Sequence, residues 1–133
     1  MDASTLTIAL VGHCGPDSFM LRSAVKYAMK VANVPLIITQ AQLDAAMKSS
    51  TASNRYVLLV NRVLDGEFDL SEGIELIQLL KASHPAVRCM VISNYPESQQ
   101  AAISAGAMPG FGKAEVGSAK MKDALASATE GLS

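Results

Sequence analysis

The stretch Tyr56-Val57-Leu58-Leu59-Val60-Asn61 decides the fold. Its first five residues are all apolar, and the sixth is an amide. This run predicts a strand over residues 56–60 that is buried on both faces. Such strands are typical of parallel sheets that carry helices on both sides. Asn61 then lies at the carboxyl edge of the sheet, where sheets of this kind bind their ligands.

The same alternation of strand and helix extends along the whole chain. Short apolar runs predict further strands over residues 6–11, 35–39, 87–92 and 110–112. Helical spacing of apolar residues, with proline and glycine at the boundaries, predicts helices over residues 16–32, 41–48, 71–83, 96–105 and 115–128. We therefore expect an α/β, flavodoxin-like (βα)5 three-layer sandwich with a parallel five-stranded sheet of order 2-1-3-4-5.

Length and composition predict one globular domain over residues 1–133, with a folded core over residues 5–128 and a frayed tail over residues 129–133. Half of the residues are hydrophobic and 17% are charged, which excludes disorder for most of the chain. Two cysteines are too few for a disulfide framework or a structural zinc site.

Charge and hydropathy also limit the partners. Eleven basic and twelve acidic residues give a net charge of −1, so no overall field attracts nucleic acid or an anionic membrane. The beginning of the sequence lacks the pattern of a signal peptide, and no apolar run is long enough to span a membrane. The sequence thus predicts a cytoplasmic protein with no nucleic-acid and no membrane partner.

The predicted strand order places a crevice at the carboxyl ends of strands one and three. The side chains that follow the strands there are candidates for function. They are Gly12-His13-Cys14, Asn61, Ser93-Asn94 and Lys113.

At these positions the chain resembles the CheY-like receiver domain of bacterial response regulators, and the resemblance covers essentially its whole length. In that family an acidic pair follows strand one, a phospho-accepting Asp ends strand three, a Ser or Thr ends strand four and a Lys ends strand five. Ser93 and Lys113 stand at the hydroxyl and lysine positions. Two further segments match the family: Ala105-Gly106-Ala107 ahead of the lysine, and Gly73-Ile74-Glu75-Leu76 at the start of helix three.

The departures from the family concern the chemistry itself. Asn61 replaces the phospho-accepting Asp, and Gly12 and His13 replace the acidic pair. Phosphoryl transfer needs an anionic nucleophile and a Mg²⁺ ion held by oxygen ligands. An amide, a glycine and an imidazole supply neither. The resemblance therefore implies an atypical, non-phosphorylatable pseudo-receiver of two-component signalling, which is not an enzyme and holds no metal or cofactor.

Acidic residues leave one alternative open, a receiver phosphorylated on a substitute carboxylate such as Asp65. The carboxylates available near the crevice are Asp17, Asp65, Glu67, Asp69 and Glu72. In the simpler interpretation the four in the loop after strand three are only solvated. We expect Lys113 to reach the Asn61 side-chain oxygen or Asp65, or else to point into water. Ser93 is expected either to switch or to cap the loop before helix four.

Two hypotheses of different classes follow. In the first, the domain works by protein contact through helix four, strand five and helix five, as a homodimer or docked to a histidine kinase or another regulator. The residues expected on that face are Tyr95, Phe111, Glu115, Lys120 and Lys122. Gly110, beside Phe111, stands at the aromatic switch position of the family. In the second, the loop from Gly12 to Gly15 and the thiol of Cys14 form a small-molecule or redox-sensing module.

The pair His13 and Cys14 does not predict a catalytic dyad, because adjacent residues at a strand end tend to point to opposite faces. Cys89, inside strand four, is expected to be a small core residue.

Overall fold

A computed structural model describes residues 5–51 and 54–132 of the chain. The elements follow one another as β1 (Thr5–Val11), α1 (Gly15–Met29), β2 (Leu36–Ile37), α2 (Gln40–Ser49), β3 (Asn54–Asn61), α3 (Gly73–Ser83), β4 (Arg88–Ile92), α4 (Pro96–Ser104), the 3₁₀ turn η1 (Lys113–Glu115) and α5 (Ala119–Thr129). Within these described ranges no helix is both long and apolar enough to cross a membrane.

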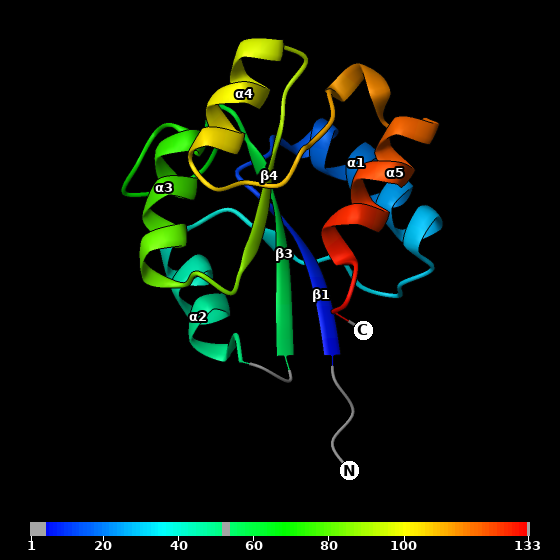
Figure 1. The fold of residues 1–133 in the computed structure, drawn as a ribbon. Helices are drawn as coiled ribbons and strands as arrows, with labels where there is room; N and C mark the ends of the chain where they lie inside the picture. The colour runs from blue at the N-terminus through cyan, green and yellow to red at the C-terminus, as the bar shows by residue number, and fades with distance from the viewer. Residues whose placement is uncertain (1–4, 52–53, 133) are drawn as a thin grey trace.

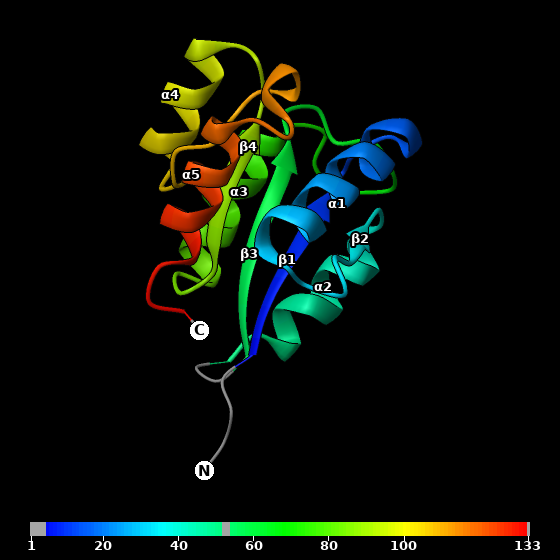
Figure 2. The ribbon, with the colours of Figure 1, turned by 90° about the vertical axis from the view of Figure 1, so that its right-hand side faces the viewer.

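The strands form one parallel sheet of order β2-β1-β3-β4, which confirms the predicted α/β fold class. β1 and β3 pair along their whole length, from Thr5 beside Asn54 to Val11 beside Val60. Figure 1 shows α1 and α5 on one side of these strands and α2, α3 and α4 on the other. In Figure 2, α1 lies in front of β1, and β2 lies at the outer edge of the sheet.

Alternate residues of β3 enter two separate cores. Val57 and Leu59 belong to the core under α1 and α5, whereas Leu58 and Val60 belong to the core under α2, α3 and α4. All four side chains are completely buried. The unbroken apolar run of β3 therefore exists because both faces of this strand are covered by helices.

The predicted fifth strand over residues 110–112 is reduced to a single parallel bridge between Ile92 and Phe111. The side-chain amide of Gln99 lies between this segment and β4. Its nitrogen donates hydrogen bonds of 3.1 Å to the carbonyls of Val91 and Ser93, and its oxygen accepts one of 3.1 Å from the Gly110 amide. Some of the backbone groups that a fifth strand would pair are thus bound by one side chain.

Gly110 allows this arrangement, because a Cβ atom there would lie 2.2 Å from the Val91 carbonyl oxygen and 3.1 Å from the Gln99 side-chain oxygen. The position that the resemblance aligns with an aromatic residue therefore tolerates no side chain in this packing.

The end of the chain differs from the prediction in two ways. The helix expected over residues 115–128 begins only at Ala119, after the separate turn η1, and the Ser118 side chain accepts a hydrogen bond from the Met121 amide at the start of α5. The tail expected to fray is packed as far as residue 132. Leu132 is 4% exposed in the core under α1 and α5, and Arg88 donates hydrogen bonds to the carbonyls of Ala128 and Glu130. That part of the prediction was wrong.

Candidate functional site

The carboxyl ends of β3 and β4 and the start of η1 enclose a small cavity of about 230 Å³. Asn61, Ser93 and Lys113, which come from three separate parts of the chain, all line it. The complete lining is Asn61, Arg62, Val63, Ile92, Ser93, Asn94, Tyr95 and Lys113. We call it the crevice cavity.

Asn61 uses its side chain to join two strand ends. Its amide nitrogen donates a hydrogen bond of 2.9 Å to the carbonyl of Gly12, and its side chain is nearly buried. An aspartate in this orientation would place a carboxylate oxygen against a carbonyl oxygen, with no proton between them. The local structure therefore uses the amide as a donor, in the place where the resembled family carries a nucleophile.

Gly12 has no room for a carboxylate. Its φ is +74°, a region that residues with a side chain rarely adopt, and a Cβ atom would lie 2.7 Å from Cδ2 of Leu64. Leu64 belongs to the loop after β3 and is almost completely buried. Leu64, an apolar side chain from another segment, thus occupies the space where the resemblance would place the first acidic side chain.

His13 is a buried residue with only 3% of its surface exposed. Its Nε2 lies 2.9 Å from the carbonyl oxygen of Leu59, and Nδ1 has no hydrogen-bond partner. Burial lowers the pKa of His13 below 6.5, against the hydrogen bond to Leu59, which raises it. Nearby charges act in both directions, because Lys113 lowers this pKa and Asp17 raises it. The imidazole is therefore neutral at pH 7 and donates its proton from Nε2 to the Leu59 carbonyl.

Lys113 pairs with neither Asn61 nor Asp65, so the sequence-based expectation for its partner was wrong. Its ammonium nitrogen lies 2.9 Å from Oδ2 of Asp17, in the first turn of α1. The hydrogen bond from Lys113 is the main reason that the pKa of Asp17 lies below its usual value. The amino end of a helix favours a carboxylate at this place as well.

Asp17 is the only one of the five candidate carboxylates that forms an ion pair with Lys113 among the described residues. In the same part of the chain, no three His, Cys, Asp or Glu side chains gather into a group that could hold a metal ion.

The loop after β3 carries Asp65, Glu67, Asp69 and Glu72, and we call it the acidic loop. It lies along the edge of the sheet. The backbone amide of Asp65 donates to the carbonyl of Gly12, that of Glu67 donates to Ile38, and Thr39 forms a parallel bridge with Glu67. β2 is consequently shorter than the predicted strand over residues 35–39, and the loop continues the pairing beyond it. Asp65 lines a different cavity from Asn61.

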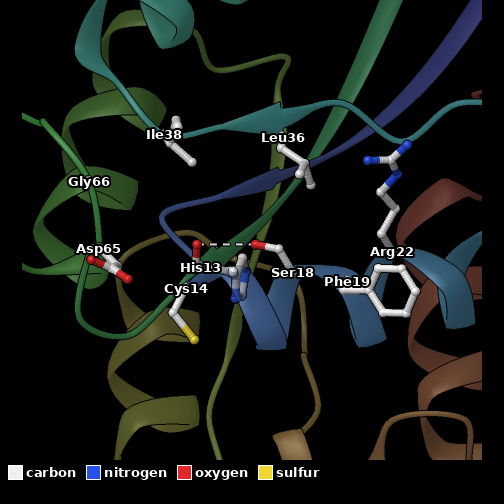
Figure 3. Close-up of a pocket in the computed structure, with 10 residues that line it drawn as sticks. His13, Cys14, Ser18, Phe19, Arg22, Leu36, Ile38, Asp65 and Gly66 are labelled. Carbon is white, nitrogen blue, oxygen red and sulfur yellow. Dashed lines mark hydrogen bonds between the residues drawn. The ribbon is translucent and has the colours of Figure 1, made fainter.

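That second cavity, of about 440 Å³, lies between α1 and the strand end of β2 (Figure 3). Cys14 and Asp65 lie at one end, and Phe19 and Arg22 at the other. The hydroxyl of Ser18 donates a hydrogen bond of 3.1 Å to the His13 carbonyl at the base of the loop. The remaining lining residues are Gly15, Leu36, Ile38 and Gly66. We call it the α1 cavity.

Ser93 and Arg62 complete the crevice cavity. The hydroxyl oxygen of Ser93 accepts a hydrogen bond of 3.2 Å from the Tyr95 amide, which is the predicted capping contact before α4. The guanidinium of Arg62 lies 5.2 Å from the centre of the Tyr95 ring. Sequence reasoning missed Arg62, although its position directly after Asn61 at a strand end was a usable signal.

One residue expected on the interaction face does not lie at the surface. Tyr95 is 53% exposed and Lys120 is also exposed. Phe111, in contrast, is 1% exposed and packs in the core with Met121 and Leu125, so its assignment to the surface was wrong. The bridge to Ile92 holds its backbone against β4, and its side chain is buried in the core under α1 and α5.

No family model and no curated protein sequence matches the chain. Solved structures do. The non-phosphorylated receiver domain of RcsB from Escherichia coli superposes with a TM-score of 0.71 at 20% identity, over 96% of this chain and 95% of that one. RcsB from Salmonella typhimurium gives the same score and identity, over 98% of this chain but 62% of its own length.

A more distant match points to the same fold. A response regulator from Burkholderia pseudomallei, solved with a phosphorylated aspartic acid, a calcium ion and citrate, has a TM-score of 0.62 at 14% identity, over 97% of this chain and 69% of that one. At these identities the comparison establishes architecture. The chain has the fold of the receiver domains of response regulators.

Proposed function

We propose that this chain is a non-phosphorylatable receiver domain that acts in signal transduction through protein–protein contacts. The observation that carries the proposal is the Asn61 side chain. It donates a hydrogen bond to the Gly12 carbonyl at the strand end where active receivers present the nucleophilic carboxylate. A neutral amide committed as a donor does not attack a phosphorus atom.

The surroundings of Asn61 support the same conclusion. The space beside Gly12 is taken by Leu64, and the His13 ring is turned toward the Leu59 carbonyl. Asp17 is the carboxylate next to Lys113, and the ammonium already neutralises it. Carboxylates that could hold a Mg²⁺ ion are therefore missing beside Asn61, and without that ion the charge of a transferring phosphoryl group would not be neutralised.

The contact surface that we propose is formed by α4, the segment after it and α5. Two grooves lie there, of about 610 and 490 Å³, and Gly110 and Lys120 line both. The half-exposed ring of Tyr95 lies at the start of α4. Aromatic rings such as that of Tyr95 are enriched at protein interfaces, and Lys120 lies beside both grooves. The partner is a histidine kinase, another regulator or a second copy of this chain.

The chemical part of the proposal is tested by intact-mass spectrometry after incubation with acetyl phosphate and Mg²⁺. We expect no covalent phosphoryl adduct on this chain. The Burkholderia response regulator, whose structure contains a phosphorylated aspartic acid, serves as the positive control. An adduct that maps to any residue lining the crevice cavity, or to Asp65, would contradict the proposal.

The contact surface is tested by site-specific photo-crosslinking in cells. A crosslinker at position 95 should capture a signalling protein or a second copy of the chain. The matched control is position 27 on α1, because Tyr27 is also an exposed tyrosine, with 84% of its surface accessible. Crosslinks from position 27 without any from position 95 would place the interface elsewhere.

The α1 cavity favours the second candidate, a small-molecule or redox-sensing module. Cys14 and the loop before α1 line this cavity, as that hypothesis requires. Alkylation of Cys14 faster than that of a free thiol peptide would support it, and an equal or slower rate would oppose it. Asp65, the substitute phosphorylation site, lines the same cavity, so the mass-spectrometry experiment tests it as well.

A further inference from the structure

The α1 cavity carries opposite charges at its two ends (Figure 3). Arg22 of α1 lies at one end, and Asp65 of the acidic loop lies at the other. Both side chains line the cavity, yet within the described residues neither forms an ion pair, with the other or with any further charge. The cavity therefore has an unpaired cation at one end and an unpaired anion at the other.

Neighbouring residues extend each charge beyond the cavity. Lys26 follows Arg22 by four residues, about one helical turn, so both cations lie on the same face of α1. Glu67 and Asp69 are exposed in the same loop as Asp65. Among the described residues, none of these three further side chains belongs to an ion pair either. Each end of the cavity is thus a patch of a single sign.

The cavity also has apolar walls. Leu36 lies in β2, Ile38 follows that strand, and Phe19 comes from α1. Phe19 has 77% of its surface exposed, and Ile38 has 46%. Large apolar side chains that gather at an exposed surface are typical of a site that binds another protein.

Backbone contacts fix the acidic loop in place. The amide of Asp65 donates a hydrogen bond of 2.9 Å to the Gly12 carbonyl, and the amide of Glu67 donates one of 2.8 Å to the Ile38 carbonyl. Gly66 allows this close approach, because a Cβ atom there would lie 2.2 Å from the Ile38 carbonyl oxygen. A surface that is already ordered loses little conformational entropy when it binds a partner.

A second copy of the chain has the matching surface. A twofold axis through the middle of the cavity reverses its direction, so Arg22 of each copy lies opposite Asp65 of the other. The same rotation brings the two apolar walls together. A contact between identical patches closes after two copies and gives a dimer instead of a filament. Charge complementarity therefore favours a second copy as the occupant of this surface.

We propose that the α1 cavity is the centre of a twofold homodimer interface, in which Arg22 of each copy pairs with Asp65 of the other and the exposed Phe19 is covered. This surface lies at the β2 edge of the sheet, whereas the contact surface of α4 and α5 lies on the β4 side, at the opposite edge (Figure 2). The inference therefore does not rest on the proposed function, and one chain can use both surfaces at once.

The experiment measures the oligomeric state of the whole chain by analytical ultracentrifugation, from micromolar to millimolar concentration. We expect a monomer–dimer equilibrium that sodium chloride shifts toward the monomer, because salt screens exposed charges. Arg22→Glu and Asp65→Arg each place like charges opposite one another at two points of the dimer. Each substitution should therefore weaken association by at least about tenfold.

Mixing the two variants tests the pairing itself. In the mixed dimer, the new carboxylate at position 22 faces the new guanidinium at position 65, and the unchanged Asp65 faces the unchanged Arg22. Variants that associate weakly alone should therefore associate when mixed, with an affinity close to that of the unchanged chain. Circular dichroism shows that each variant is folded.

Lys48→Glu is the matched control. Lys48 is an exposed cation on α2 that does not line the α1 cavity, and its replacement changes the net charge by the same amount as Arg22→Glu. This variant should dimerise like the unchanged chain. Mixed with Asp65→Arg, it should not restore the affinity, which separates a specific contact from a general attraction between opposite net charges.

Cys14 provides an independent readout, because it lies at the Asp65 end of the cavity. Its reaction with iodoacetamide should become slower as the chain concentration is raised, since the dimer covers the thiol. The comparison with a free thiol peptide, which tests the redox candidate, is therefore made at the lowest concentration, where the chain is monomeric.

Three results would overturn the inference: a chain that stays monomeric at every concentration, a dimer that neither charge reversal weakens, or variants that fail to associate on mixing. All three are read from sedimentation, so they leave the intact-mass test of the proposed function unaffected. The control position of the crosslinking test also remains valid. Tyr27 follows Arg22 by five residues, which places it about 140° further around α1.

Discussion

The Lys113 ammonium donates a hydrogen bond of 2.9 Å to the Asp17 carboxylate, and the two residues lie 96 positions apart in the sequence. The bond joins η1 to the first turn of α1. Both side chains remain about one-third exposed, so water and salt screen their attraction. In this structure the lysine at the crevice neutralises a carboxylate of α1, whereas Asn61 contributes no charge.

Replacement of Asp17 with Asn should lower the free energy of unfolding by only about 0.2–1 kcal/mol, because partly exposed ion pairs contribute little. The pKa of Asp17 is lowered in the folded state, so its contribution is complete above the ordinary value of 3.8 and is lost as the pH falls through the folded pKa. Urea unfolding at pH 7 and at low pH measures both effects. A double-mutant cycle with Lys113→Met is the control, and a coupling energy of zero would show that the pair does not stabilise the fold.

His13 should make the fold sensitive to mild acid. Burial lowers its folded pKa below 6.5, so the unfolded chain binds a proton first as the pH decreases. Stability is therefore complete above about pH 6.5 and declines below it, by at most about 1.4 kcal/mol per pH unit. Urea midpoints between pH 5 and 7.5 measure the slope.

His13→Gln should flatten that slope, whereas the matched control His84→Gln, which leaves His13 in place, should keep it. A slope that survives in His13→Gln would assign the acid sensitivity to other groups.

Gln99→Leu should free the segment after α4. The substitution removes the bonds to Val91, Ser93 and Gly110, and we expect a loss of about 1–3 kcal/mol because buried backbone groups are left without partners. Hydrogen exchange of the Gly110 amide should become faster. Gln100→Leu is the matched control, since Gln100 is exposed and its side chain makes no hydrogen bond within the described residues. Equal exchange rates in the two variants would refute the role of Gln99.

Gly12→Ala should destabilise the fold, by about 1–3 kcal/mol, since its Cβ atom would overlap the Leu64 side chain at a positive φ. Gly15→Ala is the matched control. Gly15 begins α1, and nothing lies within 4 Å of an added Cβ atom there, so alanine should be neutral or slightly stabilising. Thermal unfolding compares the two. Equal melting temperatures for both variants would mean that the loop yields easily and that position 12 has room for a carboxylate.

The two cysteines should react differently with iodoacetamide. Cys89 is 1% exposed within β4, and burial raises its pKa to about 12, so the native protein should protect it. Cys14 is half-buried at the start of α1 and remains accessible. Mass spectrometry should find one adduct on the native chain and a second only in denaturant. Two adducts on the native chain would show that β4 opens readily.

Local sequence was sufficient for the architecture. Runs such as Tyr56–Val60 are apolar without alternation, and that pattern has few explanations other than a strand buried on both faces of a parallel sheet. The order of such runs and of the helices between them implied the sheet order that the structure has for its four strands. The same reasoning predicted that Asn61, Ser93 and Lys113 lie together, because parallel strands end at the same edge of the sheet. In the structure these three residues line one cavity.

The details that sequence reasoning missed all depend on contacts between distant segments. Residues 110–112 have a strand-like composition, yet the Gln99 side chain binds the groups that they would pair. Nothing in the neighbourhood of Lys113 indicated Asp17, which reaches it only after α1 folds across the sheet.

The sequence by itself therefore determined the order of the layers and the presence of an amide, not a carboxylate, at position 61, because periodicity and residue identity are local properties. Only the tertiary structure decided which carboxylate meets Lys113, that Leu64 fills the place beside Gly12, and that Arg62 and Lys113 line one cavity without an acid. Those outcomes depend on how side chains from separate elements compete for the same space and the same charges, which no local pattern records.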